Sequence, residues 1–303
     1  MNQNADTNDF PKPTSLKWVA SLTSTAIYAA EAVSRGLPLL PSQLDHRFLD
    51  AARDLRQWIV STGRPPASIW NQLGGLSADI EDPHELASGA ISKSAMASDR
   101  AAVTALGEFL HRLKDTIRIA FPDLVEELII RAKPIREQWE SRGPGLLEEL
   151  NLQTGLTIAP QSAEVLLVAP ILGGGGHTLF KYDRVFLEAV SDHVNPDIPE
   201  TVRLAWLIAQ LGAIHAELGD SIPEGRFPLV IQLALLPPIL IAAESVGWMT
   251  FSPQQIRDVL ATWHIPTLPD RPIHEWLVHW WENHQHAAQD WNASLRSLDQ
   301  WLG

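Results

Sequence analysis

The sequence Ala163-Glu-Val-Leu-Leu-Val-Ala-Pro170 opens the most apolar part of the chain, which continues to Trp248. Leucine and valine follow one another here without helical spacing and a proline closes the run, which predicts a short buried strand. The four glycines at 173–176 permit positive φ angles and predict a wide turn. Alternating residues over 177–190 predict a second strand. We therefore expect a β-hairpin or small sheet over residues 163–190.

Helical segments follow this β element. Turn residues lead into a predicted helix over residues 200–218, in which leucine and isoleucine recur every three or four positions. Residues 227–243 are apolar except for Gln232, but Pro237-Pro238 divides them into two short helices. Because a membrane-spanning helix needs about 20 apolar residues, we interpret this run as buried core and expect no membrane span.

Composition narrows the class of protein. A chain of 303 residues with 45% hydrophobic content is long enough to bury a full core. The formal net charge of -13 argues against a nucleic-acid partner, because phosphate binding needs a basic surface. The absence of cysteine excludes disulfides and thiolate chemistry. The polar and acidic first ten residues lack the features of a secretory signal, so a cytoplasmic location is expected.

Apolar periodicity predicts a mainly α (α+β) protein around the small β element. We expect residues 1–13 to be disordered, 14–63 to form an N-terminal pair of helices, and 99–303 to form the main helical core. Residues 64–98 contain two glycines in a row and a tract rich in serine, alanine and glycine. That composition predicts a linker or mobile loop.

The glycine turn and the residues near it form the first candidate ligand site. Successive glycine N–H groups can hold an anion, so Gly174, Gly175 and His177 are candidate contacts. Their spacing differs from the phosphate-loop and dinucleotide motifs, both of which open a helix, and a flexible turn is the competing interpretation. Arg203 and Glu244 are the other two candidate ligand contacts. Burial is expected to raise the pKa of Glu244 unless it forms an ion pair with a residue such as Arg203.

The last predicted helix carries candidate metal ligands. Glu275, His279, Glu282 and His286 step by four, three and four residues, so they stack along one side and could share a divalent ion. One helix offers at most two or three ligands to one ion, so a closed site needs donors from elsewhere. An exposed polar face is the competing interpretation, and the sequence identifies no cofactor.

Tryptophans on the same helix suggest the first functional hypothesis. Seven of the 12 tryptophans lie from Trp248 onward, and Trp276, Trp280 and Trp281 are candidate contacts for a protein partner. The chain has no complete nucleophile, metal or phosphate motif. We therefore hypothesise a non-catalytic cytoplasmic protein that acts through protein–protein interaction, in an oligomeric state that the sequence does not reveal.

A resemblance suggests the alternative hypothesis. His84-Glu-Leu-Ala-Ser88 begins like the zinc-protease motif His-Glu-x-x-His, but serine replaces the second histidine. The order of hairpin and helices is similar to the layout of zincin metallopeptidases, where the active-site helix follows an edge strand. In this chain the corresponding helix carries Arg203-Leu-Ala-Trp-Leu207 in place of metal ligands. The resemblance implies a hydrolase-like enzyme, a degenerate relative of metallopeptidases, with a pocket between the glycine-rich hairpin and helix 200–218. Three polar groups converging in a concave site would favour it, whereas fully buried tryptophans would weaken the first hypothesis.

Overall fold

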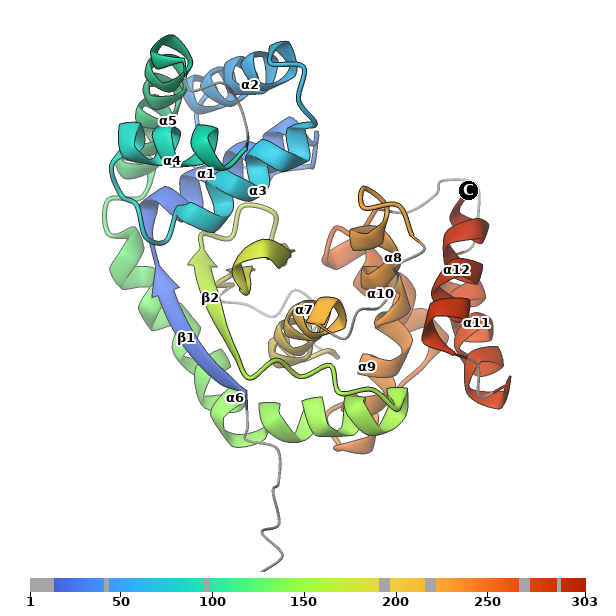
Figure 1. Ribbon diagram of the computed structural model, residues 1–303. Coiled ribbons are helices and arrows are strands. Elements are labelled where there is room, and N and C mark those ends of the chain that lie inside the picture. Colours follow the sequence, from blue (N-terminus) through green and yellow to red (C-terminus); the bar gives the residue numbers. More distant parts are fainter. Residues whose placement is uncertain are drawn as a thin grey trace, which may run out of the picture.

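The computed structural model describes residues 14–40, 44–94, 99–190, 197–215, 222–266, 273–287 and 290–303. Most of these residues are helical, and the strands form a four-stranded mixed sheet (Figure 1). The prediction of a mainly α protein with a small β element is confirmed. The segment 1–13, which we expected to be disordered, lies outside the described residues.

The sheet has the strand order β1-β2-β4-β3. Strands β1 (Ser15–Ala20), β2 (Ser162–Val168) and β4 (Arg184–Glu188) are parallel, and β3 (Gly176–Leu179) lies antiparallel to β4 at one edge. Strand β2 is central, and its last four residues are all buried. A strand covered on both faces reads as a continuous apolar run, which explains why the sequence predicted it.

The glycine turn does not close a hairpin, contrary to our expectation. Strands β2 and β3 are not neighbours in the sheet, and the glycines carry the chain from the central strand to the edge strand. The turn between β3 and β4 is instead the 3₁₀ segment Phe180–Tyr182, followed by Asp183 in the left-handed conformation (φ 51°). The predicted strand over residues 177–190 is therefore divided by this turn into β3 and β4.

Residues 15–20 form strand β1 instead of the start of a helix, which corrects the predicted N-terminal helical pair. The helix α1 (Leu22–Ser34) begins only after Ser21, which caps it. Strand β1 pairs with β2 across 147 residues of sequence. Such a distant partner is invisible to local periodicity, so tertiary pairing overrides the apparent helical pattern.

The predicted linker over residues 64–98 is also wrong in its described part, because it forms two helices, α3 (Pro66–Leu76) and α4 (Pro83–Lys93). Prolines occupy their first turns, where no intrahelical N–H is needed. A Cβ on Gly74 or Gly75 would crowd side chains of the sheet and of Tyr182. The glycines that suggested flexibility therefore permit close packing of α3 on the sheet.

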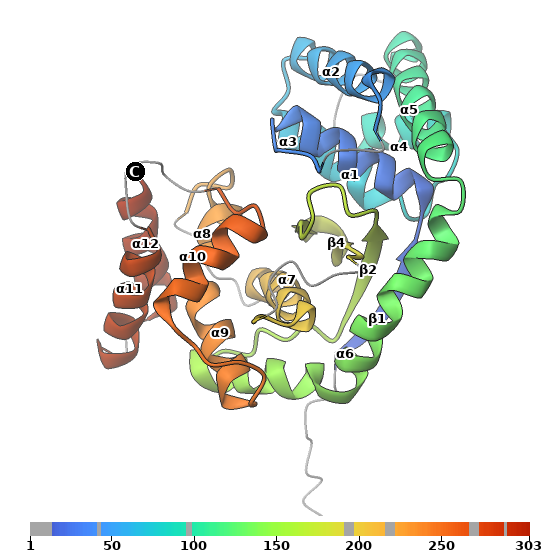
Figure 2. The same ribbon diagram turned by 180° about the vertical axis from the view of Figure 1, so that it is seen from behind.

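The helices form two groups around the sheet (Figures 1 and 2). Helices α1 to α5 lie beside the carboxyl ends of β1 and β2, and α6 curves beneath the sheet toward α7 and α9. The helices not yet given bounds are α2 (His46–Ser61), α5 (Arg100–Ala120), α6 (Leu124–Thr154), α7 (Glu200–His215), α8 (Phe227–Ala234), α9 (Leu236–Ser245), α10 (Pro253–Thr262), α11 (Ile273–Ala287) and α12 (Trp291–Leu302).

Helices α8 and α9 correspond to the apolar run of the sequence. Among the described residues, Phe227–Ser245 is the one helical segment long and apolar enough to cross a membrane by length and composition, and 67% of its most apolar window is buried within the protein. The two helices meet at Leu235, directly before the proline pair in the first turn of α9. The predicted division into two short helices is confirmed.

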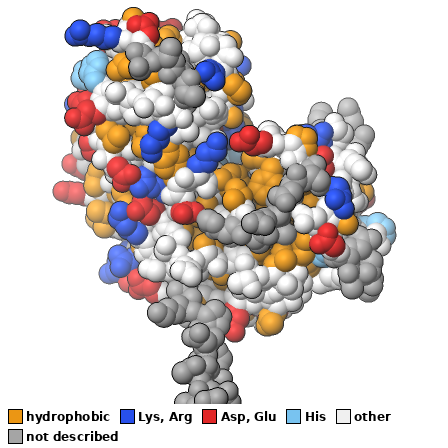
Figure 3. Space-filling model, viewed as in Figure 1, with side chains coloured by type: hydrophobic (Ala, Val, Ile, Leu, Met, Phe, Trp, Pro, Cys, Tyr) orange, Lys and Arg blue, Asp and Glu red, His pale blue; other side chains and the backbone are white. Residues whose placement is uncertain are grey.

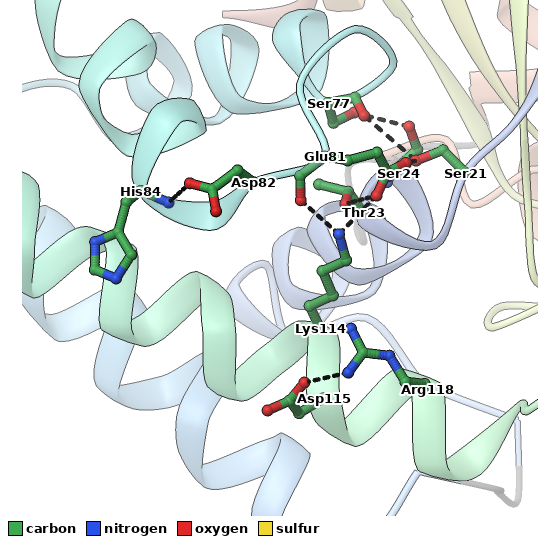
Figure 4. A network of polar contacts seen from close by, with 10 residues as sticks. All are labelled: Ser21, Thr23, Ser24, Ser77, Glu81, Asp82, His84, Lys114, Asp115 and Arg118. Carbon is green, nitrogen blue, oxygen red and sulfur yellow. Dashed lines mark hydrogen bonds and ion pairs between the residues drawn. The ribbon is translucent and has the colours of Figure 1, made fainter.

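A polar network fixes the start of α1 (Figure 4). The Ser21 hydroxyl accepts a hydrogen bond from the Ser24 N–H (3.1 Å) and donates one to Glu81 (2.9 Å). Thr23 donates to the other Glu81 oxygen (2.7 Å), and the Lys114 ammonium lies 2.6 Å from that oxygen. These polar groups are matched within the protein. The network therefore has a structural role, in which it ties α1 to α5 and to the α3–α4 connection.

Candidate functional site

Glu188 ends strand β4 and lies fully buried beneath the glycine turn. Its carboxylate accepts hydrogen bonds from the N–H groups of Leu172 (2.6 Å), Gly174 (2.7 Å) and Gly175 (3.0 Å). Positive φ angles at Gly173 (81°) and Gly174 (135°) turn successive N–H groups toward it. The N–H groups that the sequence suggested for a ligand are thus used by a carboxylate of the protein.

Arg203 holds the other side of the glycine turn. This buried side chain of α7 donates to the carbonyl oxygens of Gly175 (2.8 Å) and Glu188 (2.9 Å), and it pairs with the carboxylate of Glu200 (2.5 Å). A buried guanidinium needs such partners to compensate for lost hydration. The candidate ligand residue Arg203 therefore helps to fix the turn.

A pocket lies against this turn, between α1, α7, α8 and the end of α10. Figure 3 shows the surface hollowed between the two groups of helices, with hydrophobic side chains gathered there. The empty space of the pocket, including its open mouth, is about 440 Å³, of which about 30 Å³ is available to the centres of water-sized molecules. The polar side chains that line the pocket are Tyr28, Glu31, Arg35, His177, Gln232 and His264.

His177 is the central titratable group of the pocket. It follows the glycines in β3, its side chain is 14% exposed, and its ring stacks on Tyr28 with centroids 5.8 Å apart. Its Nε2 lies 3.3 Å from Glu31 Oε2, and no described residue forms a hydrogen bond with Nδ1. With the proton on Nε2, directed at Glu31, the imidazole presents the Nδ1 lone pair as a base.

Burial lowers the pKa of His177 below its ordinary value, and the opposing effect of the Glu31 carboxylate is smaller. The nearby positive charge of Arg35 lowers the pKa further. The imidazole of His177 is therefore neutral at pH 7. A neutral ring is the form that accepts a proton, so the environment of His177 suits a general base.

Tyr28 places a buried hydroxyl beside His177. The hydroxyl is buried beneath the turn and faces the Glu188 carboxylate, its polar neighbour. It lies so close to Gly175 that a Cβ there would overlap it, so glycine is required at this position. Burial raises the pKa of Tyr28 well above its ordinary value and the neighbouring Glu188 charge adds to the effect, so the phenol stays protonated.

His264 closes the pocket from α10. It adopts the left-handed conformation (φ 54°) just after the helix, a position that glycine usually occupies. Its Nε2 donates a hydrogen bond to the carbonyl oxygen of Leu172 (3.1 Å), which ties α10 to the glycine turn. A non-glycine residue in this conformation carries strain, and such strain concentrates at functional sites.

No match was found for this chain among protein family models, curated proteins or solved structures. The geometry of the pocket is therefore what supports a function.

The other candidates from the sequence lie elsewhere. The expected burial of Glu244 is wrong, because α9 reaches the surface there, and the exposed carboxylate accepts a hydrogen bond from the Phe251 N–H (2.9 Å). On α11, Glu275, His279 and Glu282 are exposed, with 4.0 Å between His279 Nδ1 and Glu282 Oε2. The side chain of His286 lies outside the described residues. Within the described part of the chain, no three His, Asp or Glu side chains form a group suited to a metal ion.

The tryptophans of α11 are largely inside the protein. Trp280 is 5% exposed and Trp281 is 1% exposed. Trp276 is partly buried and stacks on Trp301 of α12, with ring centroids 4.1 Å apart. Two of the three side chains expected to meet a partner thus belong to the core between α11, α12 and their neighbours. A protein partner stays a prediction, but these two rings do not form an exposed patch for it.

Sequence reasoning identified His177 but not the residues that make it a site. Tyr28 and Glu31 lie on α1 and Arg35 directly follows it, and none of the three was a candidate from the sequence. His264 stands just after α10, where glycine is usual, but it was not a candidate either. Only the packing of α1 and α10 on the glycine turn brings these residues to His177.

Proposed function

We propose that this protein is a hydrolase-like enzyme that performs acid–base chemistry on a small molecule in the His177 pocket. The carrying observation is the His177–Glu31 pair: Nε2 lies 3.3 Å from the carboxylate, while Nδ1 has no hydrogen-bond partner among the described residues. A base oriented by a second group, with its free nitrogen at a pocket, is the arrangement that general-base catalysis requires.

The proposed reaction is the hydrolysis of an ester. His177 Nδ1 takes a proton from water as the water oxygen bonds to the acyl carbon. The bond from that carbon to the leaving oxygen then breaks, and the imidazolium returns the proton to the leaving group. Glu31 acts as a positioning residue, which holds the ring and stabilises its charged form.

The test is hydrolysis of p-nitrophenyl acetate from pH 5 to pH 8. We expect the wild-type rate to rise with a pKa below the ordinary value for histidine, because the active form is the neutral imidazole of His177. His177→Asn should lower the rate about 100-fold, the lower range for general-base catalysis. His279→Asn is the matched control, because His279 is exposed on α11, and it should keep the wild-type rate.

A second variant separates catalysis from folding. Glu31→Gln removes a charge that raises the pKa of His177, so the pH profile should move to lower pH while the maximal rate falls. A residue that only supported the fold would not move the profile. The proposal is overturned if His177→Asn, shown to be folded by circular dichroism, hydrolyses the ester as fast as wild type.

A further inference from the structure

We infer that the molecule taken up by the His177 pocket is a small organic acid, whose carboxylate pairs with Arg35 while its apolar part lies against the apolar lining. This inference rests on the proposed function and names the class of ligand.

Arg35 is a cation with unused binding capacity. It follows the last residue of α1, and 38% of its side chain is exposed. Its one ion pair among the described residues is with Glu31, at 4.0 Å, and its guanidinium forms no hydrogen bond with any of them. Arg203 and Arg184 differ, because their guanidinium groups each donate to backbone oxygens and pair with carboxylates. A free guanidinium offers a planar fork that fits a carboxylate.

Gln232 adds a further donor. Its side-chain amide lines the pocket and forms no hydrogen bond with the described residues. The backbone oxygen of Gln232 accepts a hydrogen bond from Trp206 Nε1 (3.0 Å), which fixes α8 against α7. An unmatched amide beside a cation favours a ligand rich in acceptors.

Glu31, the one acidic residue of the lining in the described part of the chain, leaves Arg35 free to bind a carboxylate. Glu31 already faces His177 at 3.3 Å, closer than its 4.0 Å contact with Arg35. A ligand carboxylate would replace the long contact to Arg35 and leave Glu31 with the imidazole. The arrangement thus separates the two roles, in which Arg35 binds and His177 reacts.

Size and apolar lining restrict the rest of the ligand. The empty space of about 440 Å³ includes the open mouth, so the pocket suits a small molecule. The apolar side chains that line it include Leu37, Trp263, Ile265 and Pro266. A carboxylate on an apolar body of a few carbons matches both the cation and this lining.

Benzoate and benzamide are the probes, because they share one shape and differ in charge. Their binding to the full chain is measured by titration calorimetry and by the fluorescence of the buried tryptophans. We expect wild type to bind benzoate at least about tenfold more tightly than benzamide, the effect of one charge-assisted pair. Arg35→Gln should abolish that preference, whereas Arg118→Gln, which alters an exposed arginine on α5, should retain it.

Each other outcome has a defined meaning. Equal binding of both probes, unchanged in Arg35→Gln, would overturn the carboxylate assignment and leave the pocket as a ligand site. Failure of both probes to bind at about 10 mM would also overturn it. The ester assay decides the proposed function independently. His177→Asn should still prefer benzoate, because Arg35 provides the charge recognition.

Discussion

The polar residues at the two ends of helix α1 differ in how fully their hydrogen-bonding groups are used within the protein. At its start, Ser21 and Thr23 bond to Glu81, whose carboxylate also meets Lys114 (Figure 4). At its other end, Arg35 has one distant contact, to Glu31, among the described residues. The matched end holds the fold together. The unmatched end has free hydrogen-bonding capacity, which is what a binding site needs.

The largest expected effect concerns the support beneath the unmatched end. Glu188→Ala removes the charged acceptor for three buried N–H groups. We expect the free energy of unfolding to fall by about 3–5 kcal/mol, because each buried group left unsatisfied costs about 1–3 kcal/mol. Urea denaturation followed by circular dichroism measures it. Glu282→Ala, an exposed control on α11, should change it by less than about 0.5 kcal/mol.

An intermediate effect is expected at the matched end. Glu81→Gln weakens the contacts of Lys114 while keeping the size of the side chain, and it should lower the free energy of unfolding by about 1 kcal/mol at pH 7, since Glu81 is 58% exposed. Partial burial raises the pKa of Glu81, but hydrogen bonds from Lys114, Thr23 and Ser21 outweigh it and the pKa lies below its ordinary value.

Because the pKa of Glu81 is lowered in the folded protein, the stability that Glu81 contributes depends on pH in a known direction. A carboxyl with a depressed folded-state pKa contributes stability above its unfolded pKa and loses it as the pH falls. The difference in unfolding free energy between wild type and Glu81→Gln should therefore shrink from about pH 5 to about pH 3. A difference that stayed constant over this interval would contradict the charged role of Glu81.

The smallest effect on stability is expected at Tyr28. Tyr28→Phe deletes a buried hydroxyl beside the Glu188 carboxylate, which already accepts hydrogen bonds from three backbone N–H groups, so the free energy of unfolding should fall by about 0.5 kcal/mol or less. The hydroxyl is buried away from solvent, so the rate of ester hydrolysis should stay the same. Thermal unfolding and the ester assay on one preparation test both. A large loss of rate in a variant of unchanged stability would contradict this placement of the hydroxyl.

Local sequence predicted those parts of the fold whose cause is local. The apolar run of β2 and the proline pair before α9 each act through neighbouring residues, and both were predicted. Strand β1 was not, because its partner is far away in sequence. Gly74 and Gly75 were misread as flexible, because their role depends on Tyr182 lying across them.

The site was predictable only in part for the same reason. His177 stands next to a conspicuous glycine turn, so it was a candidate from the sequence alone. Its orienting partner Glu31 belongs to a helix about 146 positions earlier, and nothing local marks it. The burial of Glu188 likewise depends on a turn that folds back over it. Side chains that act together across the fold need the fold before they can be recognised.

The pairing of β1 with β2 also has a consequence for the order of events during synthesis. The two strands are 147 residues apart, so β1 leaves the ribosome long before its neighbour exists. At about 5–20 residues per second, that wait is on the order of 10–30 seconds. Helices α1 to α5 have time to assemble in this interval with β1 still unpaired. A nascent chain of this protein therefore carries an exposed strand edge for about half of its synthesis, and chaperones that shield such edges are expected to act there.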